Sequence, residues 1–266
     1  MKIVFSVKAI YPFHGYGGVE KYIFNLAKHL VARGINVEIV APVYKKKPGK
    51  ETYEGINYTF LAPKISGFSD SSAGRIFEHI FGIQLSRYLS GIEFDVLHGV
   101  ELTPYVYLHR KKRNKTIFHL FYDTYRKKPF HDKMFWLKYP FITLLKTNAV
   151  KYCISKADCV LTETPKQTEE MLEIFNAAPG KTFDLPVGVN LKAIGDAVSR
   201  NRDITREKTG LKAGDFVIIS VNRIVPEKGI DYLADAFVLL RKKLPGARLI
   251  LIGAGYQESA IISKLK

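Results

Sequence analysis

The sequence has few of the residues that hold small secreted domains together or anchor a chain in a bilayer. Among 266 residues it has only two cysteines, Cys153 and Cys159. Two cysteines cannot form a framework of disulfides, so we expect a reducing compartment. No apolar run reaches the roughly 18 uncharged residues of a membrane-spanning helix. The best candidate, residues 135–145, is interrupted by Lys138 and Pro140.

The start of the chain also lacks the marks of a secreted protein. Residues 1–7 form a short apolar run without the small-residue cleavage site of a signal peptide. We therefore expect a strand there and a cytoplasmic protein, with peripheral contact at the inner face of the membrane as one option.

The composition excludes general disorder and shows an uneven charge. Apolar residues make up 47% and charged residues 25%, and the length suits two domains. The net charge is +16, of which residues 1–150 carry +12 and the rest +4. Such a surplus indicates a face that meets a phosphorylated molecule, a membrane or nucleic acid, or only a well-solvated lysine-rich surface. No nucleic-acid-binding module is recognised, so we expect no nucleic-acid partner.

Strand and helix patterns alternate along the chain, which predicts an α/β fold. Apolar positions three and four apart predict a helix over residues 19–31, between strands at 2–7 and 35–41. Strand, helix and strand within about 40 residues form a crossover unit, which implies a parallel sheet. Further strands are predicted at 56–61, 94–98, 116–121, 159–162, 216–221 and 248–253, and further helices at 230–240 and 257–266.

A polar stretch between about residues 186 and 212 predicts a boundary between two domains, 1–190 and 191–266. The second domain would have only two strands. Parallel strands are apolar on both sides and need both faces covered. We therefore expect either a C-terminally truncated chain or a partner chain that completes this domain.

Two loops between a strand and a helix could bind phosphate. In the first, Gly17 and Gly18 precede a helix, where the backbone can approach an anion closely. In the second, Arg223 follows a strand and Lys228 opens a helix. Ligands of open α/β sheets bind at this edge, and a guanidinium with an ammonium suits a diphosphate. A tight turn and a solvated loop are the alternatives.

Several segments resemble GT-B glycosyltransferases of family 4. The resemblance extends over nearly the whole chain, and the segments occur in the family's order. They are Gly17-Gly18-Val19-Glu20, Ala157-Asp158-Cys159-Val160-Leu161-Thr162, Leu185-Pro186-Val187-Gly188-Val189-Asn190, Val221-Asn222-Arg223, Lys228-Gly229-Ile230-Asp231, Ala236-Phe237 and residues 248–255.

The resemblance implies two Rossmann-like domains and a retaining transfer of sugar from a UDP- or GDP-sugar to a glycan or lipid-linked acceptor. By this resemblance, the transfer requires no metal or further cofactor. By this likeness Arg223 and Lys228 would hold the donor diphosphate and stabilise the charge that builds on it, and Gly17 and Gly18 would approach the same diphosphate.

The chain departs from the family pattern in four places. The family's interdomain Asn-Gly-Val-Asp is Val187-Gly188-Val189-Asn190 here, and the family's Gly before the Arg is Asn222. The family has a His before an Asp after the strand at 116–121, whereas this chain has Tyr122-Asp123, with His119 three residues earlier. His98 is expected at a sheet edge facing the cleft. The family's two later glutamates have no counterpart before residue 266, so half of the donor site would be missing. The alternative function is therefore an inactive or partial polypeptide that binds a partner chain.

Two other segments have competing interpretations. Residues 125–139 mix bases with aromatics, which suits either an anionic membrane surface or packing on the first sheet. Gly253-Ala254-Gly255 follows a strand as a dinucleotide-binding loop would, but the third glycine and the acidic residue of that motif are missing.

Overall fold

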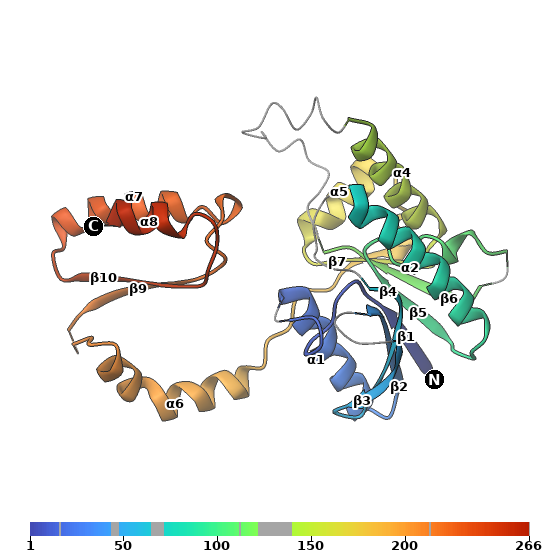
Figure 1. The fold of residues 1–266 in the computed structure, drawn as a ribbon, viewed down its shortest axis with the longest axis horizontal. Helices are drawn as coiled ribbons and strands as arrows, with labels where there is room; N and C mark the ends of the chain where they lie inside the picture. Colours follow the sequence, from blue (N-terminus) through green and yellow to red (C-terminus); the bar gives the residue numbers. More distant parts are fainter. Residues whose placement is uncertain are drawn as a thin grey trace. The chain divides into compact units, whose positions relative to one another are not determined.

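The chain forms two compact units, Met1–Gly188 and Val189–Lys266, which are described one at a time (Figure 1). The computed structural model describes residues 1–15, 17–43, 48–64, 72–111, 113–121, 140–212 and 214–265. The predicted α/β class is confirmed, with a large and mostly parallel sheet in the first unit.

The sheet of the first unit has eight strands in the order β3-β4-β2-β1-β5-β6-β7-β8. Neighbouring strands are parallel except β3, which runs antiparallel to β4 at one edge. The strands are β1 (Lys2–Ser6), β2 (Asn36–Val43), β3 (Gly49–Tyr53), β4 (Ile56–Lys64), β5 (Val96–Val100), β6 (Lys115–His119), β7 (Cys159–Thr162) and β8 (Thr182–Asp184). The strand order reverses between β1 and β5, which is where ligands of such sheets bind.

Helices cover both faces of this sheet, as parallel strands require (Figure 1). The helices are α1 (Gly18–Ala32), α2 (Ser72–Ser90), α4 (Pro140–Lys156) and α5 (Pro165–Phe175), with 3-10 turns η1 (Tyr107–His109) and η2 (Pro179–Lys181). On one face, Phe5 shares a core cluster with Ile23 of α1. On the opposite face, Val4 packs with Leu85 of α2, and Val160 packs with residues of α4 and α5.

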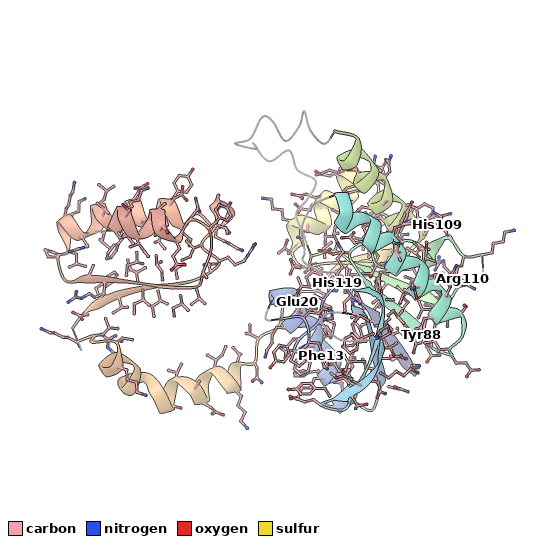
Figure 2. All side chains as sticks on the ribbon, viewed as in Figure 1. Phe13, Glu20, Tyr88, His109, Arg110 and His119 are labelled. Atoms are coloured by element: carbon pink, nitrogen blue, oxygen red, sulfur yellow. The ribbon has the colours of Figure 1, made fainter. Side chains whose placement is uncertain are left out.

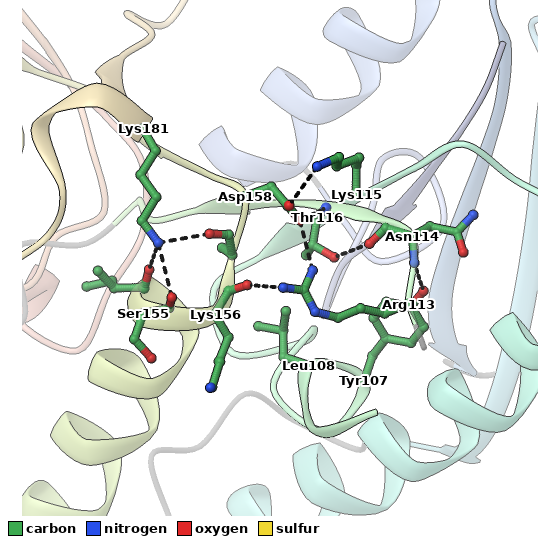
Figure 3. A network of polar contacts seen from close by, with 12 residues as sticks. Tyr107, Leu108, Arg113, Asn114, Lys115, Thr116, Ser155, Lys156, Asp158 and Lys181 are labelled. Carbon is green, nitrogen blue, oxygen red and sulfur yellow. Dashed lines mark hydrogen bonds and ion pairs between the residues drawn. The ribbon is translucent and has the colours of Figure 1, made fainter. Parts of the chain in front are cut away.

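Basic side chains satisfy the carbonyl groups at the C-terminus of α4 (Figure 3). Lys181 Nζ donates to the carbonyls of Ile154 at 2.8 Å and Ala157 at 2.9 Å. Arg113 donates to the Lys156 carbonyl and pairs with Asp158 at 2.8 Å. Cations at a helix C-terminus are favoured by the helix dipole. Part of the positive charge of the first unit therefore has a structural use.

The second unit has a parallel two-stranded sheet and three helices within its described residues. Its elements are α6 (Leu191–Lys208), β9 (Phe216–Val221), η3 (Pro226–Lys228), α7 (Ile230–Lys243), β10 (Ala247–Ile252) and α8 (Glu258–Leu265). Leu251 packs into a cluster that includes Ala234 of α7 and Ile261 of α8. Ile252, which points to the other face of the sheet because side chains alternate along a strand, is 53% exposed.

The structure corrects two expectations about the connecting segments. The expected boundary between about residues 186 and 212, for which no helix is predicted, contains α6. The sequence does contain a helical pattern here, because Leu191, Ile194 and Val198 are spaced three and four residues apart, as on one side of a helix. The lysine-rich residues 45–50 are expected to form a loop; of these, 48–50 are described, and Gly49 and Lys50 belong to β3, whose hydrogen bonds to β4 hold a polar segment at the edge of the sheet.

The core of the first unit contains two buried histidines on adjacent strands. His98 of β5 and His119 of β6 are 4% and 0% exposed, and their Nε2 and Nδ1 atoms lie 3.0 Å apart. Phe5 stacks on His98 and Phe121 stacks on His119. Burial lowers the pKa of His98 and lowers that of His119 to about 3, so both rings are neutral at pH 7.

We predict that this pair makes the first unit sensitive to acid. Below pH 6.5 the unfolded chain takes up protons on its histidines while folded His119 does not, so stability falls as the pH decreases. The loss is about 1.4 kcal/mol per pH unit for each such histidine. Replacing His119→Phe, which keeps an aromatic ring beside Phe121, should reduce this slope between pH 6.5 and 5.5, as measured by denaturant unfolding at each pH.

The matched control is His29→Gln on the exposed side of α1, which should leave the slope unchanged. An unaltered slope in the His119→Phe variant would contradict the burial of a neutral His119.

Candidate active site

The glycines Gly17 and Gly18 lie at the start of α1, at the carboxyl edge of the first sheet. Gly17 is the N-cap of α1 and makes no side-chain capping bond. Glu20 lies in the first turn (Figure 2), and a Cβ built on Gly17 would be 1.8 Å from Glu20 Oε2. This carboxylate places negative charge at the helix start that would otherwise attract an anion. The backbone role expected for Gly17 and Gly18 stays a prediction.

His14 fixes the loop that leads to these glycines. Its Nδ1 accepts the Ile10 N–H at 3.3 Å, so its Nε2 carries the proton and donates to the Pro42 carbonyl at 2.9 Å. Burial lowers the pKa of His14, which favours this neutral form. The loop after β1 is thereby tied to β2, and the start of α1 is held at the sheet edge.

A cluster of charged side chains lies where the strand order reverses between β1 and β5, and the sequence patterns did not predict it. Lys8 follows β1 and pairs at 2.8 Å with Glu101, which follows β5, and at 2.8 Å with Glu78 of α2. Burial opposes the charge of Lys8, but the two carboxylates outweigh it and raise its pKa. Glu101 has a φ of 51°, a strained backbone for a residue with a side chain. Lys8 directly follows the strand predicted at 2–7, and this position could have identified it, whereas the strand predicted at 94–98 ends three residues before Glu101.

In the second unit, Arg223 and Lys228 lie on the single loop that joins β9 to α7. Lys228 ends η3, and Gly229 has a φ of 65° that turns the chain into α7. The side chains of Arg223 and Lys228 are exposed. The loop therefore presents a guanidinium and an ammonium at the carboxyl end of β9, which is the chemistry expected for a diphosphate.

The neighbouring loop after β10 supports the loop of Arg223. The Ile224 N–H donates to the Ala254 carbonyl at 3.0 Å. A Cβ on Gly253 would lie 1.9 Å from the Asn222 carbonyl oxygen, and one on Gly255 would lie 2.1 Å from that of Ile224. Close packing of two loops therefore explains these glycines without a dinucleotide. The segment on either side of Arg223 is held by backbone contacts.

The remaining predicted residues are divided between the core and the undescribed part of the chain. His98 was expected to face a cleft, but it is buried beside His119 because Phe5 and Phe121 pack against the pair. Tyr122 and Asp123 lie outside the described residues. In the part of the chain that the structure describes, no three His, Cys, Asp or Glu side chains form a group that could hold a metal ion, and no helix is long and apolar enough to cross a membrane.

A cavity of about 560 Å³ lies at the opposite, amino edge of the first sheet. Its lining residues are Phe94, Asp95, Lys111, Arg113, Asn114, Lys115 and Asp158. Asp158 already pairs with Arg113 at 2.8 Å and with Lys115 at 3.2 Å. The charges of this cavity are therefore largely satisfied by one another, and the carboxyl edge is the better candidate for a ligand site.

The chain is similar to known glycosyltransferases along almost its whole length. Residues 16–193 match the model of Glycosyltransferase Family 4, and residues 201–265 match that of glycosyl transferases group 1. A curated relative, alpha-monoglucosyldiacylglycerol synthase of Acholeplasma laidlawii, is 26% identical over 271 residues, covering 93% of this chain and 62% of the relative. The chain thus spans less than two thirds of that relative's length.

Two solved structures show the same fold. Sucrose-phosphate synthase from Thermosynechococcus elongatus has a TM-score of 0.73 at 19% identity, over 95% of this chain and 62% of that one. The catalytic domain of starch synthase IV from Arabidopsis thaliana, bound to ADP and acarbose, has a TM-score of 0.70 at 14% identity, over 98% and 70%. These similarities confirm the expected GT-B-like α/β fold. With the family match over residues 16–193, they establish that the chain belongs to Glycosyltransferase Family 4.

Proposed function

We propose that this chain acts in a retaining transfer of sugar from a nucleotide-sugar, such as a UDP- or GDP-sugar, to a hydroxyl of a lipid-linked or glycan acceptor. The observation that carries this proposal is the loop with Arg223 and Lys228, because it lies at the carboxyl end of β9 within the region that matches glycosyl transferases group 1. The starch synthase of similar fold binds a nucleoside diphosphate, ADP, and the Acholeplasma relative is named for making a glycolipid.

The proposed reaction places negative charge on a diphosphate. The acceptor oxygen forms a bond to the anomeric carbon of the sugar while the bond from that carbon to the diphosphate oxygen breaks. The diphosphate leaves with the electron pair, and the hydroxyl proton passes to a diphosphate oxygen or to water. Arg223 would hold the diphosphate by forked hydrogen bonds and Lys228 by its point charge, and both stabilise the leaving group.

We further propose that the chain associates peripherally with an anionic membrane at the cytoplasmic face. The first 150 residues carry +12 of the net charge, and basic surfaces are attracted to anionic headgroups. The name of the Acholeplasma relative indicates a lipid acceptor for that protein.

We predict that Arg223→Ala and Lys228→Ala each weaken the binding of UDP or GDP by about tenfold to a hundredfold, because each removes a charged hydrogen-bonding partner of the diphosphate. Each should reduce sugar transfer by about 10²-fold. Isothermal titration and a radiolabelled transfer assay with UDP- and GDP-sugars measure the two effects.

Arg241→Ala, at an exposed position near the end of α7, removes the same charge from another part of the second unit and serves as the control. Unchanged nucleotide binding and transfer in Arg223→Ala would show that the assigned role is wrong.

For the membrane, we predict co-sedimentation with phosphatidylglycerol vesicles at low salt and release at high salt, because screening weakens surface electrostatics. Phosphatidylcholine vesicles should bind little. Equal binding to both lipids at both salt concentrations would rule out an electrostatic contact.

A further inference from the structure

Glu163 lies at the carboxyl edge of the first sheet, and among the described residues no cation pairs with its carboxylate. His119 pairs with Leu161 across β6 and β7, and the Leu120 N–H donates to the Leu161 carbonyl at 2.9 Å. Continuing this register places Phe121 beside Glu163. Because side chains alternate along a strand, Glu163 lies on the same face as His119 and Phe121. This is the face that α1 covers.

Tyr22 of α1 packs against the rings of Phe121 and His119. Its ring lies 5.3 Å from that of Phe121 and 5.7 Å from that of His119. Burial, together with the charge of Glu163, raises the pKa of Tyr22 to about 12. The Nε2 atom of His119 is buried and has no hydrogen-bond partner among the described residues. The electrostatic effect on Tyr22 places Glu163 close to this residue of α1.

The carboxylate of Glu163 differs from those of Glu38 and Glu101, two other acidic groups of this unit that are withdrawn from water. Glu38 forms an ion pair with Lys2 and accepts hydrogen bonds from Thr59 and Tyr88. Glu101 is met by Lys8. The backbone N–H of Glu163 donates to Gln167 Oε1. Its carboxylate, by contrast, forms no ion pair or hydrogen bond within the described residues. The side chain is half-buried, and burial raises its pKa. Withdrawing an unpaired charge from water is costly, and a ligand that donates hydrogen bonds to this carboxylate would offset that cost.

We propose that Glu163 determines acceptor specificity by accepting hydrogen bonds from the hydroxyl groups of an uncharged polyol, such as a sugar or inositol ring. This inference rests on the proposed transferase function. A carboxylate is an acceptor only, and it binds hydroxyl donors strongly when partly withdrawn from water. It repels a phosphate at the same place. Glu163 therefore selects an acceptor whose reacting end is neutral and rich in hydroxyls, and it disfavours a phosphorylated one.

The test is a chemical-shift titration of the full chain with methyl α-glucoside, myo-inositol and myo-inositol 1-phosphate, followed at the amides of Tyr22 and Phe121. At least one neutral probe should bind, and the phosphate should bind about tenfold more weakly or less. Glu163→Gln, which has the same shape without the charge, should weaken the binding of the neutral probe about tenfold. The difference in affinity between the neutral probe and myo-inositol 1-phosphate should become smaller. Glu173→Gln, on the exposed side of α5, is the matched control.

The proposal is overturned if neither neutral probe binds, if the phosphate binds best, or if Glu163→Gln leaves all three affinities unchanged while its melting temperature matches the parent. A titration with UDP on the same variants separates this result from the proposed function. Glu163→Gln should bind UDP normally, whereas absent UDP binding in the parent chain would count against the donor site and leave the polyol result to be judged by itself.

Discussion

The carboxyl edge of the parallel strands is the constraint on which the rest of the structure depends. In the first unit the strand order reverses between β1 and β5, which is the position where ligands of such sheets bind. The start of α1, the Lys8–Glu101 ion pair and Glu163 all lie at this edge. In the second unit, Arg223 and Lys228 hold the same position relative to β9. Each unit thus places its polar groups where its own fold exposes them.

The electrostatics of the two units are complementary to different ligands. The first unit has a large positive charge, yet the groups at its carboxyl edge include Glu20, Glu101 and Glu163, and several of its cations cap helix ends or pair with acids. The second unit places two exposed cations on one loop. From these charges we propose that the first unit binds a hydroxyl-bearing acceptor and the second unit binds a diphosphate.

Sequence patterns predicted the fold well where a segment is buried and periodic. The stripe from Val19 to Val31 and the β-branched runs of β1 and β2 are of this kind. The runs of β9 and β10 were also predicted, although several of their side chains are exposed. The sequence patterns did not predict α6, where Leu191, Ile194 and Val198 lie among charged residues. The site was harder, because ion pairs between residues distant in sequence cannot be inferred from spacing. Glu163 could be recognised only when the register of β6 and β7 placed it beside Phe121.

The central claim is that the loop with Arg223 and Lys228 holds the diphosphate of a nucleotide-sugar. Photolabelling with 5-azido-UDP-glucose, followed by mass spectrometry of the digested chain, tests it most directly. We expect a label on peptides that contain residues 222–229, and an excess of UDP should suppress it. A label concentrated at the amino-edge cavity around Lys111 and Lys115, or one that UDP does not suppress, would contradict it.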